Sequence, residues 1–361
     1  MNEHLLEVNG LRVSFDTYAG EVKAVRGVDF YLDGGETLAI VGESGCGKSV
    51  TVQTIMRLNP EPPAAIRGGS ILYKGEDLTK KTDKEMRAYR GKEFSMIFQD
   101  AMTSLNPVSR IGRQMSEAIR IHEKDVTREE AKARAIEMLG KVGLSNPETV
   151  YRRYPHTLSG GQRQRVMIAM ALCCHPSILL ADEPTTALDV TTQAQILKLM
   201  KDIQKDTGCG IILITHNLGV VARMAERVAV MYAGQIVEKG ALSDIFYHPK
   251  HPYTWGLLGS MPDMQESRST RLTAIPGSPP DLFAPPRGCG FAPRCPYCME
   301  VCLSHDPGET PVAPGHTSRC WLLDERAGNH VKPPVGIDAE LVTEEMKAYR
   351  ESAAEGGKEN V

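Results

Sequence analysis

The sequence lacks any apolar run long enough to cross a membrane as a helix. Its longest apolar stretches, such as residues 166–174, fall far short of the roughly 20 residues that a span requires. The first four residues, Met-Asn-Glu-His, show no basic stretch followed by an apolar run, so we expect no signal peptide. We therefore expect any membrane association to come through a partner.

Long basic runs are also missing. The 361 residues include 42 Lys or Arg and 45 Asp or Glu, which gives a formal net charge of −3 and a pI near 6.4. This balance does not suggest nucleic acid as the main partner. The length allows a full hydrophobic core and up to two domains.

The nine cysteines are an odd number without export signals, which favours a reducing cytosol and argues against disulfides. Five of them lie between residues 289 and 320, in a proline-rich segment without a strand pattern, so metal binding is the leading interpretation. Their spacing does not match a paired C-x-x-C zinc ribbon. Cys295, Cys298 and Cys302 could hold three corners of an iron–sulfur cluster, with Cys289 or Cys320 as the fourth. Structural zinc and buried free thiols are the alternatives.

One glycine-rich stretch fits the phosphate-binding pattern G-x-x-x-x-G-K-[ST] in the right context. Residues 38–41 predict a short buried strand before it, and residues 50–58 predict a helix after it. Several backbone N–H groups and the positive end of the helix dipole then face one point, so a polyphosphate is the natural ligand. Lys48 would reach the β- and γ-phosphates, and the Ser49 hydroxyl would bind Mg²⁺. The stretch, the phosphate loop, is Gly42, Glu43, Ser44, Gly45, Cys46, Gly47, Lys48 and Ser49.

The rest of the chain predicts an α/β fold. Short strand patterns at 6–8, 11–15 and 22–32 indicate a small antiparallel sheet before a parallel core. Residues 114–142 predict a helical sub-domain, with a capping box at Thr127–Glu130 and a stop at Gly143. A second helix begins at residues 158–162, Leu-Ser-Gly-Gly-Gln, the signature segment, which is a second potential anion site. A hairpin at 227–239 closes the domain.

Polar side chains follow three of the predicted strands. Asp182 suits second-shell binding of Mg²⁺, and the adjacent Glu183 suits polarisation of the attacking water. Gln99 ends one strand, and His216 follows another at the edge where α/β folds bind ligands, which makes it a candidate for contact with the γ-phosphate. Phe15 and Tyr18 could stack on a base, although sheet packing explains them equally well.

Taken in order over about two hundred residues, these elements resemble the ATP-binding cassette (ABC) family. The resemblance implies a P-loop ABC ATPase domain with a RecA-like parallel sheet, an antiparallel β subdomain and an α-helical subdomain. It also implies a dimer in which ATP lies between one chain's phosphate loop and the other chain's signature segment. Glu183, His216 and Gln99 are then catalytic, and Ser49, Gln99 and Asp182 hold Mg²⁺. Phe15 is the preferred base-stacking aromatic and Tyr18 the second choice. The remaining nucleotide contacts are residues 42–49, Val50, Gln99, Asp182, Ser159, Gly160, Gly161, Gln162 and Asp189.

The C-terminal part resembles the extension of ATP-binding subunits of dipeptide and oligopeptide importers, a group that includes nickel importers. The resemblance rests on residues 251–258, 275–280 and 288–296 and covers roughly 5–323. It implies a [4Fe–4S] cluster on Cys289, Cys295, Cys302 and Cys320, with Cys298 as a spare. The expected divisions are a cassette at 1–245 (helical subdomain about 100–165), a cysteine-rich domain at 246–323 and a partly disordered tail at 324–361.

We therefore expect an ATPase that powers import of peptides from the cytoplasmic face of the cell (inner) membrane, where it is peripheral. Its implied partners are two membrane-spanning permease subunits, a second ABC ATPase subunit and, indirectly, an extracytoplasmic solute-binding protein. The second ATPase makes a heterodimer, or a homodimer as the alternative. Import of nickel or another small solute is the alternative function. A soluble ABC ATPase acting on ribosomes or DNA is less consistent with the sequence, because paired cassettes and a long coiled-coil insertion are both missing.

Overall fold

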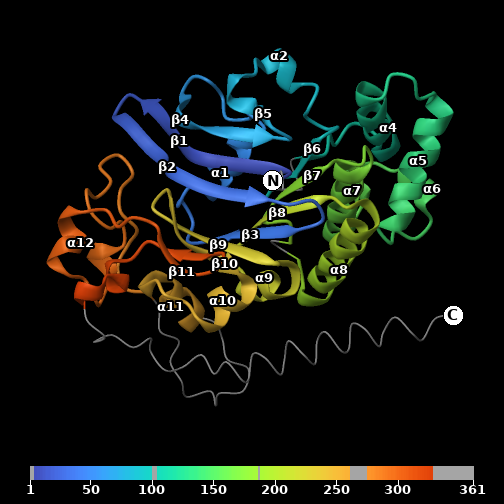
Figure 1. The fold of residues 1–361 in the computed structure, drawn as a ribbon. Helices are drawn as coiled ribbons and strands as arrows, with labels where there is room; N and C mark the ends of the chain where they lie inside the picture. The colour runs from blue at the N-terminus through green and yellow to red at the C-terminus, as the bar shows by residue number, and fades with distance from the viewer. Residues whose placement is uncertain (1–3, 100–103, 186–187, 261–274, 328–361) are drawn as a thin grey trace.

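The computed structural model describes residues 4–99, 104–185, 188–260 and 275–327. In Figure 1 a helical block lies at one end of the molecule and the C-terminal extension at the other, with two sheets between them. No helix of the described ranges is long and apolar enough to cross a membrane. The predicted tail lies outside these ranges beyond residue 327.

The first sheet is antiparallel and has the strand order β2-β1-β4-β5. Its strands are β1 (Leu6–Thr17), β2 (Gly20–Leu32), β4 (Ala64–Tyr73) and β5 (Glu76–Asp77). The expectation of separate strands at 6–8 and 11–15 was wrong, because β1 is continuous with a register shift between Val8 and Leu11. Gly10 has a φ of 56° there, and its N–H donates to the Asp29 carboxylate (2.6 Å), so the chain bends without ending the strand.

The second sheet carries the parallel core and has the order β11-β12-β10-β9-β3-β8-β7-β6. Five neighbouring strands run parallel and are almost wholly buried: β3 (Thr37–Val41), β6 (Phe94–Ile97), β7 (Ile178–Asp182), β8 (Gly210–Ile214) and β9 (Arg227–Tyr232). Helices α1 (Lys48–Ile55), α8 (Val190–Thr207) and α9 (Leu218–Met224) connect them. Parallel strands present their carboxyl ends at one edge of the sheet, so residues 42–49, Gln99, Asp182 and His216 all follow strands at that edge.

The helical block is built from α4 (Ile111–His122), α5 (Arg128–Lys141), α6 (Pro147–Arg152) and α7 (Gly160–Leu172). Two shorter helices, η1 (Leu78–Lys80) and α2 (Asp83–Met86), precede it, and the turn η2 (Pro155–Thr157) lies within it. The predicted capping box is present: Thr127 accepts from the N–H of Glu130, and the Glu130 carboxylate accepts from the N–H of Thr127. Gly143 has a φ of 71° just after α5, as a helix stop requires.

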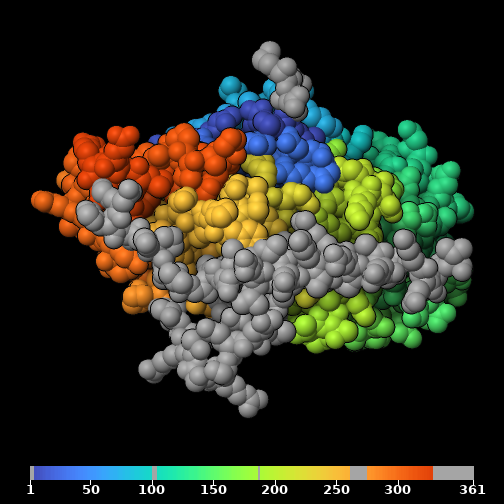
Figure 2. Space-filling view, turned by 60° about the horizontal axis from the view of Figure 1, so that its bottom comes forward, coloured from blue at the N-terminus to red at the C-terminus, as the bar shows by residue number. Residues whose placement is uncertain are grey.

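The C-terminal extension is joined to the cassette by the same sheet. After β10 (Gln235–Ala241) come α10 (Leu242–Tyr247), α11 (Pro252–Gly259), η3 (Ala292–Arg294), α12 (Glu300–Ser304) and the turns η4 (Trp321–Leu323) and η5 (Glu325–Ala327). The cysteine-rich segment, predicted to be poor in strands, contains a short hairpin, β11 (Thr310–Ala313) and β12 (His316–Ser318), and β12 pairs with β10. Figure 2 shows the orange and red part of the extension lying beside the blue N-terminal strands. One buried cluster spans both parts, from Val41 to Phe291.

Candidate functional site

The phosphate loop connects β3 to α1 through three glycines at positive φ: Gly42 (152°), Gly45 (79°) and Gly47 (102°). A Cβ on Gly42 would lie 2.1 Å from the Met231 carbonyl oxygen, and one on Gly47 would lie 2.4 Å from that of Ala24. No other residue fits these two positions, since both the space and the backbone conformation require glycine. The loop therefore ends with Lys48 and Ser49 as the first residues of α1, with the helix N–H groups directed at the loop.

Lys48 lies inside this loop and is only 7% exposed. Its ammonium donates to the carbonyls of Gly42 (2.8 Å) and Glu43 (2.7 Å), and the Cys46 thiol lies 3.7 Å away. Two backbone carbonyls hold this buried ammonium, and no carboxylate of the described residues forms an ion pair with it. A buried positive charge of this kind suits a site for a polyphosphate.

Asp182 ends β7 beside the loop and is 4% exposed. Burial raises its pKa, the charge of Glu183 adds to the rise, and a hydrogen bond with Ser49 together with the Lys48 charge opposes it. A buried carboxylate next to a serine hydroxyl is the oxygen-ligand pair that Mg²⁺ prefers with a nucleotide. The structure thus brings together two of the three side chains predicted to hold Mg²⁺.

Glu183 is held at the centre of a three-residue group. Its carboxylate accepts from the Gln99 amide (3.1 Å) and lies 2.9 Å from Nδ1 of His216. The side chain is 13% exposed, whereas that of His216 is 64% exposed. Glu183 also has a φ of 47°, a strained conformation for a residue with a side chain, of the kind found where a reacting group must be aimed. The three predicted catalytic residues therefore come from three strand ends and meet at one carboxylate.

The signature segment forms a helix start of its own. Ser159 caps α7 and makes a reciprocal capping box with Gln162, at 3.1 and 3.3 Å. Asp189 caps α8 by accepting from the N–H of Thr192 (2.9 Å). Within the described part of the chain, no hydrogen bond or ion pair joins residues 159–162 to residues 42–49. Within one chain, the two predicted nucleotide-contacting segments are therefore not joined by a polar contact among the described residues.

The two aromatic candidates differ in exposure. Phe15 lies within β1 opposite Val22 and Ala64 and is partly buried, while Tyr18 occupies the turn after β1 and is fully exposed. Nothing in the chain covers Tyr18 within the described ranges, so it is the freer of the two to stack on a base.

All five C-terminal cysteines come close enough to influence the ionisation of at least one other: Cys289, Cys295, Cys298, Cys302 and Cys320. Burial, followed by the charges of Cys289, Cys295 and Cys302, raises the pKa of Cys320 to about 12. Burial likewise raises that of Cys295 to about 11. The N–H of Cys289 donates to the carbonyl of Cys302 (2.8 Å), whereas Cys298 is exposed. In the ranges that the structure describes, no three His, Cys, Asp or Glu side chains are placed to hold a metal ion together.

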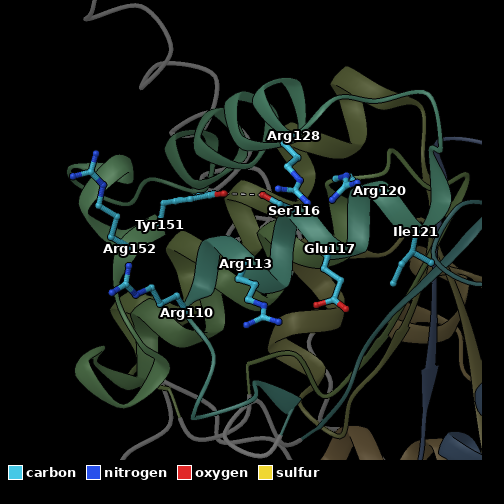
Figure 3. A pocket seen from close by; sticks show the side chains of 9 residues that line it. All are labelled: Arg110, Arg113, Ser116, Glu117, Arg120, Ile121, Arg128, Tyr151 and Arg152. Atoms are coloured by element: carbon cyan, nitrogen blue, oxygen red, sulfur yellow. Dashed lines mark hydrogen bonds between the residues drawn. The ribbon is translucent and has the colours of Figure 1, made fainter.

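A basic hollow of about 710 Å³ on the helical block was not anticipated from the sequence. Figure 3 shows arginines of α4, α5 and α6 around it, with Ser116 and Tyr151 hydrogen-bonded across it at 2.8 Å. Arg110, Arg113, Glu117 and Arg120 recur at helical spacing, so the sequence did carry this signal. The lining side chains are Arg110, Arg113, Ser116, Glu117, Arg120, Ile121, Arg128, Tyr151 and Arg152.

Family models match two parts of the chain. The model described as ABC transporter matches residues 25–186, which include the phosphate loop, the signature segment and Asp182–Glu183. The model described as oligopeptide/dipeptide transporter, C-terminal region, matches residues 237–302, which include four of the five C-terminal cysteines.

Whole-chain relatives agree with both models. The oligopeptide transport ATP-binding protein OppD of Bacillus subtilis is 56% identical over 337 residues, 93% of this chain and 94% of that protein. The dipeptide transport ATP-binding protein DppD of the same organism is 56% identical over 91% of this chain and 98% of its own length. Among solved structures, the dimeric bacterial ABC transporter cassette MJ0796 is 26% identical with a TM-score of 0.60, covering 66% of this chain and 98% of that chain. A post-hydrolysis dimer of the same cassette, bound to ADP and Pi, has a TM-score of 0.59 over the same shares of the two chains.

Proposed function

The chain belongs to the ABC transporter family of ATPases, and we propose that it is the subunit whose ATP hydrolysis powers import of dipeptides or oligopeptides. The observation that carries the substrate class is the match of its C-terminal extension to the oligopeptide/dipeptide transporter region. Nickel or another small solute remains the alternative cargo for the same machinery. Transport of labelled peptides by vesicles containing the assembled complex, with nickel as the competing cargo, distinguishes the two.

ATP binding is proposed to close a dimer. The phosphate loop and Lys48 of one chain would hold the phosphates, while Ser159 to Gln162 of the partner, with Asp189 near the contact, would complete the site. Two observations support this arrangement: no hydrogen bond or ion pair joins the two segments within the described residues of one chain, and the similar cassettes are described as dimers. Val50 and Phe15 or Tyr18 would supply the remaining contacts to the nucleotide.

Hydrolysis is proposed to depend on the group around Glu183. When bound, Mg²⁺ would neutralise charge on the phosphates, with Ser49, Gln99 and Asp182 as its protein neighbours. Glu183 would accept a proton from the attacking water, because it is a carboxylate held in one orientation by Gln99 and His216. The His216 side chain is 64% exposed, so it would be free to reach the γ-phosphate when a partner chain closes the site.

The permease subunits are proposed to bind the helical block at its basic hollow. Arg113, Arg120, Arg128 and Arg152 make no ion pair within the described residues, and Ile121 is 62% exposed beside them. Unpaired arginines around an exposed apolar side chain fit an acidic, partly apolar loop of a membrane subunit. On this proposal the chain would be a peripheral subunit at the cytoplasmic face of the membrane, and it would reach the solute-binding protein only through the permease.

A pull-down from detergent-solubilised membranes tests the partners. The wild-type chain should retain two permease subunits and a second ABC ATPase, and a second copy of this chain in its place would show a homodimer. Arg113→Glu combined with Arg120→Glu should lose the permease subunits, whereas Lys198→Glu on exposed α8 should retain them. Retention by the double variant would contradict the proposed docking surface.

The gathered cysteines are proposed to bind a [4Fe–4S] cluster through Cys289, Cys295, Cys302 and Cys320, with zinc as the alternative. Support comes from the chemistry of the donor set: five thiols lie in one short segment and influence one another's ionisation, and Cys298 is the exposed one among them. Gly288 allows the backbone before Cys289 to lie close to Cys302, since a Cβ at residue 288 would lie 2.1 Å from the Cys302 carbonyl oxygen. The cluster would be structural and would belong to a C-terminal domain at 246–323, following a cassette at 1–245 whose helical subdomain spans about 100–165.

Metal analysis of anaerobically purified protein tests this assignment. The protein should contain about four iron atoms and absorb light at about 400 nm. Cys302→Ser should lose the iron, and Cys298→Ser should keep it. Colourless protein with stoichiometric zinc would overturn the iron–sulfur assignment, and loss of iron from Cys298→Ser would overturn the ligand set.

A further inference from the structure

Arg294 connects the C-terminal extension to the phosphate loop. It lies at the end of η3, directly before Cys295, and its guanidinium forms a bidentate ion pair with the Glu43 carboxylate at 2.6 and 2.9 Å. Arg294 is 5% exposed and Glu43 is 25% exposed, so solvent screens this pair little. Glu43 is the second residue of the loop, directly after Gly42.

All five N–H donors of Arg294 have an acceptor. Besides the two bonds to Glu43, the guanidinium donates to the carbonyls of Pro276 (2.8 Å) and Ile275 (3.3 Å) and to the Tyr232 hydroxyl (3.2 Å). A guanidinium presents its five donors in one plane, so this set of acceptors leaves it a single orientation. The side chain is therefore a rigid support and not a mobile surface charge.

The backbone of Glu43 is held from the same side. Its N–H donates to the hydroxyl of Tyr253 (2.8 Å), a fully buried residue of α11. Tyr253, Tyr232 and Phe291 pack together, with ring centroids 4.5 to 5.4 Å apart. On its other side the loop meets β9, where Gly42 allows the close approach to Met231. Residues 42 and 43 are thus wedged between the cassette sheet and the extension.

We propose that Arg294 is a positioning residue for ATP binding, which holds the phosphate loop in its binding conformation by gripping Glu43 from the extension. The N–H groups of a glycine-rich loop converge on a phosphate only when the loop is ordered, and ordering it costs conformational entropy. A loop that is already ordered before ATP arrives does not lose this entropy on binding, so its affinity is higher. Within the described residues, no hydrogen bond or ion pair joins Arg294 to Lys48, so we assign its effect on the site to its contact with Glu43. This assignment concerns the ATP site of the ABC ATPase and does not depend on the transported substrate.

A double-mutant cycle on the full chain tests the assignment. Arg294→Met should weaken ATP binding about tenfold, raising the Kd and the KM, while kcat at saturating ATP stays within about twofold. Glu43→Gln should weaken binding about threefold, and the double variant should match Arg294→Met alone, because both changes break one contact. Arg294→Lys should fall between wild type and Arg294→Met, since lysine keeps the charge but loses the bidentate pair.

Arg319→Met is the matched control. Arg319 also lies in the extension and pairs with a carboxylate, Asp306 (3.2 Å), but it follows β12, which β10 and β9 separate from β3 in the sheet order. It should leave the Kd for ATP unchanged. A lowered Tm with an unchanged Kd in Arg294→Met, or additive effects in the double variant, would overturn the proposal. If Arg294→Met does not fold, Arg294→Lys takes its place in the cycle, and an unchanged Kd in both Arg294→Lys and Glu43→Gln overturns it equally.

Discussion

Replacing Glu183 by glutamine separates ATP binding from hydrolysis. The carboxylate is oriented by Gln99 at 3.1 Å and His216 at 2.9 Å in a site where only 13% of it is exposed. Glutamine has nearly the same shape, so it fits this space, but it cannot accept a proton from water. General-base catalysis contributes about 10²- to 10⁴-fold. We therefore expect turnover to fall at least about 10²-fold, which corresponds to a barrier higher by at least about 2.7 kcal/mol.

The assay is phosphate release by the assembled transporter at saturating Mg-ATP, with ATP affinity measured in parallel. Affinity should be retained, because Lys48 and its contacts are untouched. Glu137→Gln, which changes an exposed carboxylate paired with Lys141 on α5, is the control and should hydrolyse at the wild-type rate. Turnover by Glu183→Gln within about threefold of wild type would refute the assignment of Glu183 as the base.

Three further predictions concern charge and burial. Asp182→Asn should raise the Tm of nucleotide-free protein at pH 7 by about 2 °C and abolish stabilisation by Mg-ATP. Because burial raises the pKa of Asp182, the ionised carboxylate lowers the stability of the wild-type fold above the ordinary carboxyl pKa. The difference in Tm between Asp182→Asn and wild type should therefore shrink below about pH 4. A lower Tm of the variant at pH 7 would contradict this reasoning. Burial also raises the pKa of the Cys46 thiol, so an alkylating reagent should modify exposed Cys298 first and Cys46 only slowly, with a faster rate at high pH. Mass spectrometry identifies the modified residue. Alkylation of Cys46 should block ATP binding, and bound ATP should protect Cys46. Glu238→Gln should lower the free energy of unfolding by about 3 kcal/mol. Fully buried Glu238 accepts hydrogen bonds from the N–H groups of Lys250 and His251, and it pairs with His316 of β12 (2.9 Å). An unchanged denaturation midpoint would show that this pair does not anchor β12.

Much of the ATP site was predictable because its parts are local. Three glycines followed by Lys48 and Ser49 specify a strand–loop–helix turn whose conformation depends on a few adjacent residues. The positions of Gln99, Glu183 and His216 were predictable for a related reason: each follows a buried apolar strand, and parallel strands deliver their ends to one edge. The interpretation of Ser159 and Gln162 as a capped helix start rested on a four-residue pattern and matches the structure.

Features that join distant segments were not predictable in this way. The C-terminal hairpin was missed because His316–Ser318 is too short to show a strand pattern, and it becomes a strand only by pairing with β10. The basic hollow required three helices of the helical block to bring their arginines to one surface.

The sequence by itself determined a glycine-rich phosphate-loop motif, a carboxylate pair at the end of a buried strand and a cysteine-rich extension, since each depends on a short stretch of adjacent residues. Only the tertiary structure decided that the extension grips the loop. Arg294 and Glu43 are 251 residues apart, and no local pattern relates them. They meet because β9 lies beside β3 in the sheet and because the extension packs its aromatic residues against the end of β9. Whether such an ion pair forms depends on the tertiary structure, because the fold must bring the two residues together. Its strength depends on how far the folded core buries the two side chains.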